Sequence, residues 1–170
     1  MKIMLLFILL NVLMSSPSIY DYSFTSISGE KIEMSSFKGK KILVVNTASK
    51  CGFTKQYKDL QKLHEQYGDK LVIIGFPANN FGNQEPGSNT VIQEFCERNF
   101  GVTFLLSEKV EVKGEEMAPL FKYLTHADNP DFTGDIKWNF EKFLIDENGK
   151  LIHRYRSAVN PMDEKITGQI

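Results

Sequence analysis

The stretch KILVVNTASKCGFTKQYKDLQKLHEQYGDKLVIIGFP, residues 41–77, decides the fold. It begins with a continuous apolar, β-branched run at 41–46 and ends with a second apolar run at 71–77. Continuous rather than alternating apolarity over so short a length is typical of a strand that is buried on both faces of a sheet. The sequence therefore predicts two buried strands at the two ends of this stretch.

A helix is predicted between these two strands. Apolar residues recur there at helical spacing on one stripe, namely Tyr57, Leu60, Leu63 and Tyr67. We expect the helix to begin at about Thr54, with Thr54 as its cap, and to end at Gly68. Strand, helix and strand together make a βαβ unit, which implies a parallel strand pair with a right-handed crossover.

The segments around this unit complete an α/β pattern. Residues 20–40 predict a β-hairpin that turns at Ser28 and Gly29, and residues 136–156 predict a second hairpin that turns across 146–149. Residues 101–114 are interpreted as a loop with a possible short strand, and a last helix is expected to start at Pro161.

Two further helices are expected between the βαβ unit and the second hairpin. One begins at Ser88 or Asn89, and its inner face would carry Val91, Ile92, Phe95 and Cys96. The other spans about 114–126, and its inner face would carry Met117, Leu120, Phe121 and Leu124. This order of elements predicts a thioredoxin-like α/β fold, with a central mixed β-sheet flanked by helices and an N-terminal β-hairpin.

Composition narrows the class of protein. A chain of 170 residues is expected to form one domain, and a net charge of −1 with interspersed signs gives no basic surface for nucleic acid. Its two cysteines are too few for a disulfide framework. The three histidines, His64, His126 and His153, have no carboxylate or cysteine at ligand spacing, so neither a metal nor a cofactor is expected.

The N-terminus departs from this ordinary composition. Residues 1–18, MKIMLLFILLNVLMSSPS, combine a lysine, a short apolar run and small residues, a pattern typical of a secretory signal peptide. The apolar run is shorter than the ~20 residues that span a bilayer. We therefore expect an exported protein, periplasmic or secreted, whose mature domain, residues 19–170, has no stable membrane insertion. An N-terminal core element, which would leave the protein cytoplasmic, and an uncleaved anchor are the alternatives.

Cys51 is the first candidate for chemistry. It stands where a buried strand runs into a predicted helix, and the unpaired N–H groups of a helix N-terminus favour a thiolate over a thiol. A lone cysteine is also often a small buried hydrophobe, so its position alone leaves packing and catalysis open. The position three residues later is Thr54, so a thioredoxin-type Cys-x-x-Cys dithiol is excluded.

Four ordered motifs carry a resemblance to a known family. They are NTASKCGFT at 46–54, FPANNFGNQEPGS at 76–88, FCERNFGVTF at 95–104 and IKWNFEKFLID at 136–146. Together they resemble the glutathione peroxidase family over nearly everything after residue 18. Peroxiredoxins are a poorer match, because the position three residues before their reactive cysteine holds a threonine, and here it holds Ala48.

The resemblance implies a peroxidase with a defined set of site residues. The nucleophile would be Cys51, assisted by Gln84, Trp138 and Asn139, whose neutral N–H groups can stabilise negative charge without quenching the nucleophile. Attack on a peroxide, either hydrogen peroxide or an organic or lipid hydroperoxide, would leave a sulfenic acid on Cys51. Trp138 as a core aromatic, and Gln84 and Asn139 as ordinary turn and strand residues, are the alternatives.

The second cysteine decides how such an enzyme would be reset. In family members that use thioredoxin, a cysteine in the corresponding helix resolves the sulfenic acid as a disulfide, and this resemblance assigns that role to Cys96. Some members have a second candidate where this chain has Ala78. A thioredoxin-like protein is the expected reductant; the alternative is glutathione, with Cys96 structural.

The segment HADNPDFTGDIKWNF lacks the insertion through which tetrameric members pack, so the resemblance implies a monomer.

Two alternatives to a peroxidase function stay open. One is a peroxide sensor that relays oxidation to a partner protein, and the other is a non-catalytic secreted domain with a structural disulfide.

Overall fold

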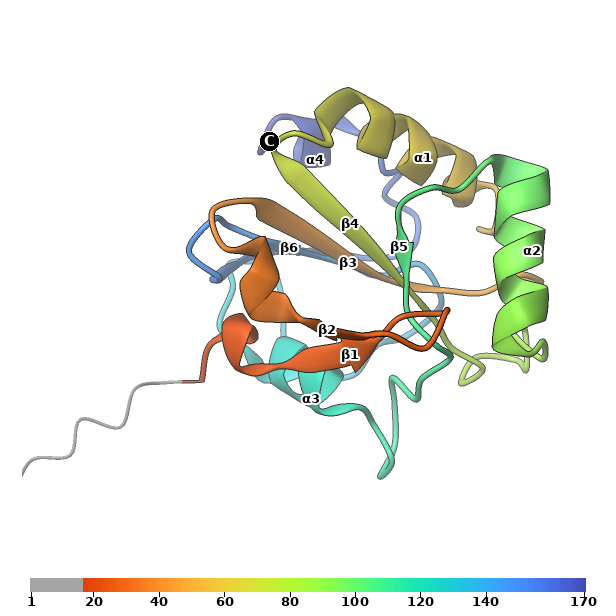
Figure 1. Cartoon of the computed structure of the whole chain (residues 1–170). Helices are drawn as coiled ribbons and strands as arrows, with labels where there is room; N and C mark the ends of the chain where they lie inside the picture. The colour runs from red at the N-terminus through yellow and green to blue at the C-terminus, as the bar shows by residue number, and fades with distance from the viewer. Residues whose placement is uncertain (1–16) are drawn as a thin grey trace, which may run out of the picture.

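The computed structural model describes residues 17–170, so the predicted signal peptide lies outside the described residues except for Pro17 and Ser18. Short 3-10 helices and strands precede the main sheet in the chain (Figure 1). The elements are η1 Ile19–Asp21, β1 Ser23–Thr25, β2 Lys31–Glu33, η2 Met34–Phe37, β3 Lys41–Thr47, α1 Gln56–Tyr67, β4 Leu71–Pro77, α2 Asn89–Phe100, β5 Leu105–Leu106, α3 Pro119–His126, β6 Lys142–Ile145, β7 Leu151–Tyr155 and α4 Glu164–Thr167.

A five-stranded mixed sheet forms the centre of the domain, with strand order β5-β4-β3-β6-β7. β3 and β4 pair in parallel over their whole length, from Lys41 opposite Leu71 to Thr47 opposite Pro77. β6 pairs antiparallel with both β3 and β7, and β1 and β2 form a separate antiparallel hairpin. The predicted parallel pair, both hairpins and the mixed sheet are therefore confirmed.

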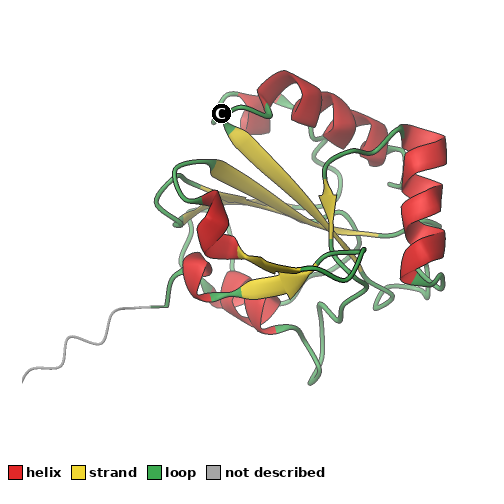
Figure 2. Ribbon diagram, in the orientation of Figure 1, coloured by secondary structure: helices red, strands yellow, loops and turns green. Residues whose placement is uncertain are grey.

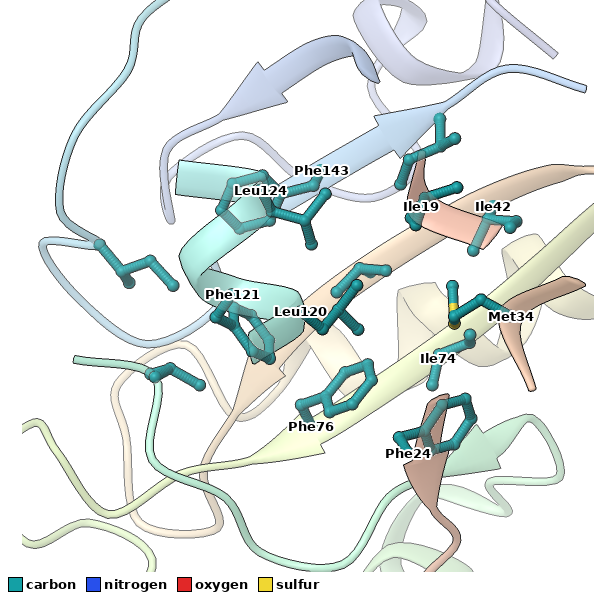
Figure 3. Close-up of a cluster of buried hydrophobic side chains, with 14 of the residues drawn as sticks. Ile19, Phe24, Met34, Ile42, Ile74, Phe76, Leu120, Phe121, Leu124 and Phe143 are labelled. Atoms are coloured by element: carbon teal, nitrogen blue, oxygen red, sulfur yellow. The ribbon is translucent and has the colours of Figure 1, made fainter. Parts of the chain in front are cut away.

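Helices cover both faces of this sheet (Figures 1 and 2). Along β3, Ile42 and Val44 point into the core that α3 and the N-terminal hairpin close, which Figure 3 shows. Leu43 and Val45 point to the opposite core, which α1, α2 and α4 close. All four side chains are fully buried, which confirms that the continuous apolar run indicates a strand covered on both faces.

The helix boundaries confirm some expectations and correct others. α2 begins as predicted, with the Ser88 hydroxyl accepting a hydrogen bond from the Val91 N–H, but Val91 itself is 58% exposed and does not belong to the inner face. α3 begins at Pro119 rather than near 114, because the chain passes Gly114 with a φ of +89° and proline is favoured in a first helical turn. The last helix is a single turn, in which Ile166 is fully buried.

The topology brings three loops to one edge of the sheet. β3 and β4 are parallel, so their carboxyl ends, and the loops that follow Thr47 and Pro77, lie at the same edge. β6 runs antiparallel to β3, so the segment that enters β6 at Lys142 lies at that edge as well. These three loops carry Cys51, Gln84 and Trp138 respectively.

Candidate active site

Cys51 lies in a turn between β3 and α1, and its side chain is half-exposed. The Cys51 N–H donates to the Thr54 Oγ1 at 2.9 Å, and the Thr54 hydroxyl donates to the Ala48 carbonyl at 2.8 Å. The Phe53 N–H points at the sulfur, with a nitrogen to Sγ distance of 3.4 Å. This amide is the backbone donor that is directed at the sulfur.

Two details of this turn correct the sequence-based expectation. α1 begins at Gln56, and Lys55 rather than Thr54 occupies its cap position. Cys51 therefore lies outside the first turn of the helix. The effect of the helix dipole is weak at that position, because it falls off beyond the first turn. Thr54 instead uses its hydroxyl to close the Cys51 turn, so the donor at the sulfur is the amide of Phe53 and not the end of the helix.

Gln84 is carried by the loop that follows β4. Two consecutive left-handed residues, Gly82 and Asn83, precede it with φ values of +63° and +52°. The Gln84 carbonyl accepts a hydrogen bond from the Lys50 N–H at 3.0 Å, which connects this loop to the Cys51 turn. Its side-chain Oε1 accepts from the Asn139 Nδ2 at 3.0 Å. The Nε2 group of Gln84 has no hydrogen-bond partner among the described residues.

Trp138 and Asn139 lie in a turn before β6, not in the strand where the sequence placed them. Asn46, near the end of β3, makes four hydrogen bonds to this turn. Its Nδ2 donates to the Trp138 carbonyl and its N–H to the Glu141 carbonyl, and its carbonyl and Oδ1 accept from the N–H groups of Phe140 and Glu141 respectively. Phe140 has a φ of +65°, which is rare for a bulky residue. The strained turn persists because the hydrogen bonds of Asn46 fix the backbone of Trp138, Phe140 and Glu141.

The two side chains of this turn have different exposures. Asn139 is fully buried, with its Nδ2 directed at Gln84, and its Oδ1 has no hydrogen-bond partner among the described residues. Trp138 is 38% exposed, and its ring rests on Phe81 of the Gln84 loop with a centroid separation of 5.8 Å. An indole this exposed is not a core aromatic, so the packing alternative for Trp138 is wrong.

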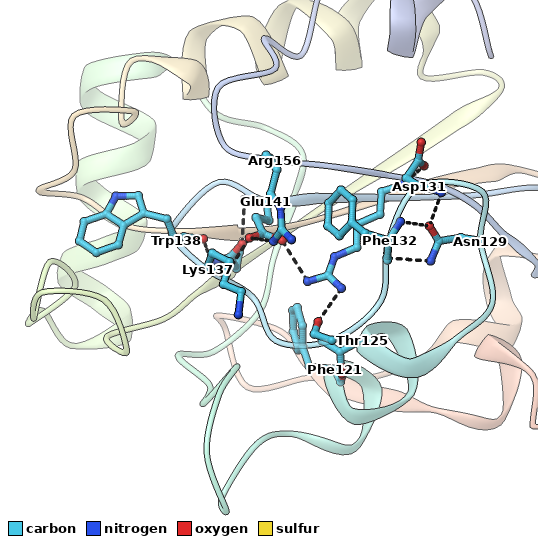
Figure 4. Close-up of polar contacts among 12 residues, drawn as sticks. Phe121, Thr125, Asn129, Asp131, Phe132, Lys137, Trp138, Glu141 and Arg156 are labelled. Carbon is cyan, nitrogen blue, oxygen red and sulfur yellow. Dashed lines mark hydrogen bonds and ion pairs between the residues drawn. The ribbon is translucent and has the colours of Figure 1, made fainter.

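A buried charge network supports the same turn from behind (Figure 4). The fully buried carboxylate of Glu141 accepts hydrogen bonds from the Lys137 N–H at 2.7 Å, Arg154 at 3.0 Å and Arg156 at 2.7 Å. The guanidinium groups of Arg154 and Arg156 also stack on the Phe132 ring. These contacts fix the backbone immediately before Trp138.

The predicted site residues are thus brought together to different degrees. Backbone and side-chain contacts link the Cys51 turn to Gln84, Gln84 to Asn139, and Trp138 to the Gln84 loop. In the described part of the chain, the sulfur of Cys51 itself has only the Phe53 N–H as a hydrogen-bond partner. The three loops that carry the four residues are therefore connected to one another, and none of these contacts involves the sulfur itself.

No disulfide joins Cys96 to Cys51. Cys96 is fully buried on α2, both cysteines are free thiols, and burial raises the pKa of the Cys96 thiol to about 12. Its neighbour Tyr57 is also fully buried, and burial raises the pKa of that hydroxyl well above its usual value. The Tyr57 ring lies edge-on to Phe140, with a centroid separation of 5.5 Å, so it connects the Cys96 environment to the Trp138 turn.

Sequence reasoning missed the residues that hold the site in place. Asn46 offered a signal, because a polar side chain at the end of a run buried on both faces must find hydrogen-bond partners. Glu141 offered a weaker one, as a carboxylate beside a buried strand. Ser49 and Glu85, whose side chains bond each other across two loops, offered none.

The described residues contain neither a metal-binding cluster nor a membrane-spanning helix. In residues 17–170 no group of three or more histidine, cysteine or acidic side chains is placed to hold a metal ion. Within the same range, no helix has the length and apolar character needed to cross a bilayer.

The architecture defines the class of protein first. The domain superimposes on a secreted disulfide oxidoreductase of Mycobacterium tuberculosis with a TM-score of 0.61 at 10% identity, covering 89% of this chain and 94% of that one. At this identity the likeness shows the fold alone, which is the thioredoxin-like fold predicted from the order of elements.

The family follows from closer matches. The family model described as "Glutathione peroxidase" matches residues 19–125. The chain is 50% identical over 149 residues to the glutathione peroxidase-like peroxiredoxin GPX5 of Chlamydomonas reinhardtii, which covers 87% of this chain and 92% of that one. It is 49% identical over 151 residues to the hydroperoxy fatty acid reductase gpx1 of Synechocystis, covering 85% and 89%. The chain belongs to the glutathione peroxidase family.

A solved structure agrees with this assignment. The apo form of Trgpx superimposes with a TM-score of 0.70 at 38% identity, covering 91% of this chain and 94% of that one. The protein is therefore an oxidoreductase of the peroxidase class, which reduces peroxides, and the resemblance inferred from the four motifs is confirmed.

Proposed function

We propose that this protein reduces peroxides through Cys51, with Gln84, Trp138 and Asn139 as the groups that stabilise the transition state. The Cys51 thiolate attacks the terminal peroxide oxygen, the O–O bond breaks, and the leaving oxygen takes a proton and departs as water or an alcohol. The observation that carries this proposal is the half-exposed sulfur, which receives the Phe53 N–H in a turn that is hydrogen-bonded to Gln84 through the Lys50 N–H.

The neutral donors around the sulfur suit this chemistry. The Gln84 Nε2 group, whose amide oxygen already accepts from Asn139, is free to donate to a peroxide, and the partly exposed indole of Trp138 carries a second N–H. Donors fixed before the reaction stabilise the charge that develops on the leaving oxygen without reorganising. The open face at Trp138 supports both hydrogen peroxide and bulky organic or lipid hydroperoxides as substrates, and the name of the Synechocystis relative, a hydroperoxy fatty acid reductase, points to the same class.

We further propose that Cys96 resolves the Cys51 sulfenic acid. The Cys96 sulfur would displace the hydroxyl group, which leaves as water with the thiol proton, to form a Cys51–Cys96 disulfide. A disulfide requires Cα atoms within about 7 Å. Because Cys96 is fully buried on a helix, we propose that α2 opens locally before the bond forms.

The reductant that restores both thiols would be a thioredoxin-like dithiol protein. Relatives in Chlamydomonas and in Saccharomyces cerevisiae are named glutathione peroxidase-like peroxiredoxins, a name that fits reduction by a protein thiol. The complete burial of Cys96 favours a second candidate, a glutathione-dependent enzyme with Cys96 structural. A peroxide sensor would share the first step and pass the oxidation to a partner protein.

One assay separates these candidates. Peroxide consumption is measured with a thioredoxin system and, in parallel, with glutathione, for the wild type, Cys51→Ser and Cys96→Ser. We expect turnover with thioredoxin, none in Cys51→Ser, and a single turnover in Cys96→Ser. Full steady-state turnover of Cys96→Ser with glutathione would favour the second candidate, and an inert wild type would overturn the peroxidase proposal.

Residues 1–18 are proposed to export a monomeric mature domain, residues 19–170. The support for export is the lysine, apolar run and small residues at the N-terminus. N-terminal sequencing of the protein from fractionated cells tests it: an exported form that begins near residue 19 is expected, and an intact cytoplasmic chain contradicts it. Sedimentation at micromolar concentration tests the monomer.

A further inference from the structure

Glu85 is a buried carboxylate for which the proposed chemistry has no role. Its side chain is 1% exposed and lies next to Gln84 in sequence. Burial raises the pKa of this carboxyl, and the Ser49 hydrogen bonds and the charges of Lys109 and Lys50 act in the opposite direction. A buried carboxylate is costly unless it is hydrogen-bonded, so the contacts it makes at this position are informative.

Those contacts connect the two loops that carry Cys51 and Gln84. The Ser49 hydroxyl donates to Glu85 Oε2 at 3.1 Å. The N–H of the next residue, Lys50, donates to the carbonyl of Gln84, the residue before Glu85, at 3.0 Å. Two adjacent hydrogen bonds between the same two loops prevent the loops from sliding past each other as well as from moving apart. Ser49 lies two residues before Cys51, so this double link ends close to the sulfur.

Glu85 is itself fixed from the other side. Its N–H donates to the Asn79 Oδ1 at 2.9 Å, and the Lys109 Nζ reaches the carbonyls of Gly87 at 2.8 Å and of Glu85 at 3.5 Å. The backbone at Glu85 is therefore held independently of the Cys51 turn. Because the Glu85 backbone is anchored in its own loop and the Glu85 side chain is bonded to Ser49, Glu85 fixes the position of the Cys51 turn relative to the Gln84 loop.

We propose that Glu85 is a positioning residue for the peroxide-reducing step, which holds the Cys51 turn against the Gln84 loop through the hydroxyl of Ser49. The inference rests on the proposed function, because it takes Cys51 as the nucleophile and Gln84 as a donor. Fixing the separation of these two groups before peroxide binds removes the cost of orienting them during the reaction, and an error of ~1 Å in such a geometry can lower a rate by about a hundredfold.

The carboxylate is better suited to this task than an amide. An ionised carboxylate accepts hydrogen bonds only, and a bond to a charged acceptor is roughly twice as strong as a neutral one. Glutamine at this position would present a donor as well as an acceptor to the Ser49 hydroxyl. The Glu85→Gln variant therefore changes the contact while preserving volume.

The test measures the first step alone. Each variant is made with Cys96→Ser also present, and the second-order rate constant for loss of the Cys51 thiol is followed after mixing with hydrogen peroxide. Ser49→Ala and Glu85→Gln are each expected to lower this constant about 10- to 100-fold. Ser49→Thr, which retains the hydroxyl, is expected to stay within a few-fold of the parent. Glu94→Gln, an exposed acid on α2, is the matched control and should not change the rate.

A double-mutant cycle separates positioning from a general structural role. If Ser49 and Glu85 act through their mutual bond, the doubly substituted protein reacts no more slowly than the slower single variant. Effects that multiply, or rates that follow the thermal midpoint of each variant, would overturn the inference. So would single variants within twofold of the parent.

Failure of the inference and failure of the proposed function give different results. If Cys51→Ser still reduces peroxide, Cys51 is not the nucleophile and the proposed function fails. If Cys51→Ser is inert while Ser49→Ala and Glu85→Gln react normally, the proposed function stands and the positioning role is refuted. Ser49→Ala removes one half-buried hydroxyl, so it tests the role even where Glu85→Gln does not fold.

Discussion

Cys51 and Cys96 have the same side chain and contact the same apolar cluster, but they differ in exposure and in the structure that carries them. Cys51 is half-exposed in an irregular turn, and the Phe53 N–H donates to its sulfur. Cys96 is fully buried on α2 between apolar neighbours, and burial raises the pKa of its thiol to about 12. The first thiol is accessible in the folded state, and the second is closed from solvent. The comparison teaches that position in the fold, not residue type, gives the two thiols different access, which is the basis of the different roles that we propose for them.

The largest expected effect comes from replacing each cysteine in turn. Cys51→Ser should abolish peroxide reduction, whereas Cys96→Ser should consume one equivalent of peroxide and then stop when thioredoxin is the reductant. The difference arises because only Cys51 performs the first step. Stopped-flow measurement of peroxide loss, with mass spectrometry of Cys51 after trapping of the sulfenic acid, checks both outcomes. Equal residual activity in the two variants would remove the distinction between the two thiols.

The next effect concerns the buried Glu141 network that holds the Trp138 turn. Glu141→Gln removes the counter-charge of Arg154, which is 1% exposed, and it weakens the hold on the Lys137 N–H before Trp138. Breaking one side of a buried ion pair costs about 3–5 kcal/mol. Urea unfolding at neutral pH should show that loss. Glu147→Gln, which disrupts an exposed ion pair with Lys41, is the control and should change stability little.

A third effect is the pH dependence of the free energy of unfolding, which differs between the Trp138 turn and the surroundings of Cys96. Burial lowers the pKa of Lys142, whose ammonium donates to the Phe140 carbonyl in the Trp138 turn, to about 7 from 10.5. The unfolded chain therefore binds more protons than the native one above pH 7, and the free energy of unfolding should rise by up to about 1.4 kcal/mol per pH unit between roughly pH 7 and 9. Denaturation of Lys142→Met over this range should show a flatter profile, and an unchanged slope would contradict the assignment.

Cys96 should act in the opposite direction at higher pH. Its folded pKa of about 12 lies above its unfolded value of 9.0, so the stability it contributes is fully present below pH 9. That stability is lost progressively as the pH rises toward 12. Tyr57, whose pKa burial also raises, has the same sign above pH 10. Cys96→Ser should therefore differ from the wild type in slope only above about pH 9, which distinguishes it from Lys142→Met.

The smallest effect tests the opening of α2. Gly101 ends this helix with a φ of +61°, and the Val102 N–H bonds the carbonyl of Cys96 across the cap. Alanine at this left-handed position costs roughly 1 kcal/mol. If disulfide formation requires α2 to open, Gly101→Ala should speed formation of the Cys51–Cys96 disulfide about fivefold, because 1.4 kcal/mol corresponds to a factor of ten.

A matched glycine controls for general destabilisation. Gly39 also has a positive φ, of +86°, and open space around its Cβ position, but it lies before β3 and away from α2. Gly39→Ala should leave the rate of disulfide formation unchanged, as followed by non-reducing electrophoresis after one equivalent of peroxide. Equal acceleration by both substitutions would show that global rather than local opening limits the reaction.

The sequence determined the scaffold of this protein and the identity of its reactive groups. Continuous apolar runs fixed β3 and β4, because burial on both faces of a sheet leaves no position for polar side chains. The Ser88 cap marked the start of α2, and four ordered motifs were enough to name the family. These features depend on local pattern, which is visible in a linear chain.

Only the tertiary structure decided how the site is held. The start of α1 at Gln56, the left-handed Phe140, and the contacts of Asn46, Glu141 and Glu85 were not predicted, because each depends on hydrogen bonds between segments far apart in sequence. Propensity is short-ranged, whereas a buried polar group takes the partners that the packed chain presents. The sequence therefore named Cys51 and Cys96, and the fold made one accessible and the other closed.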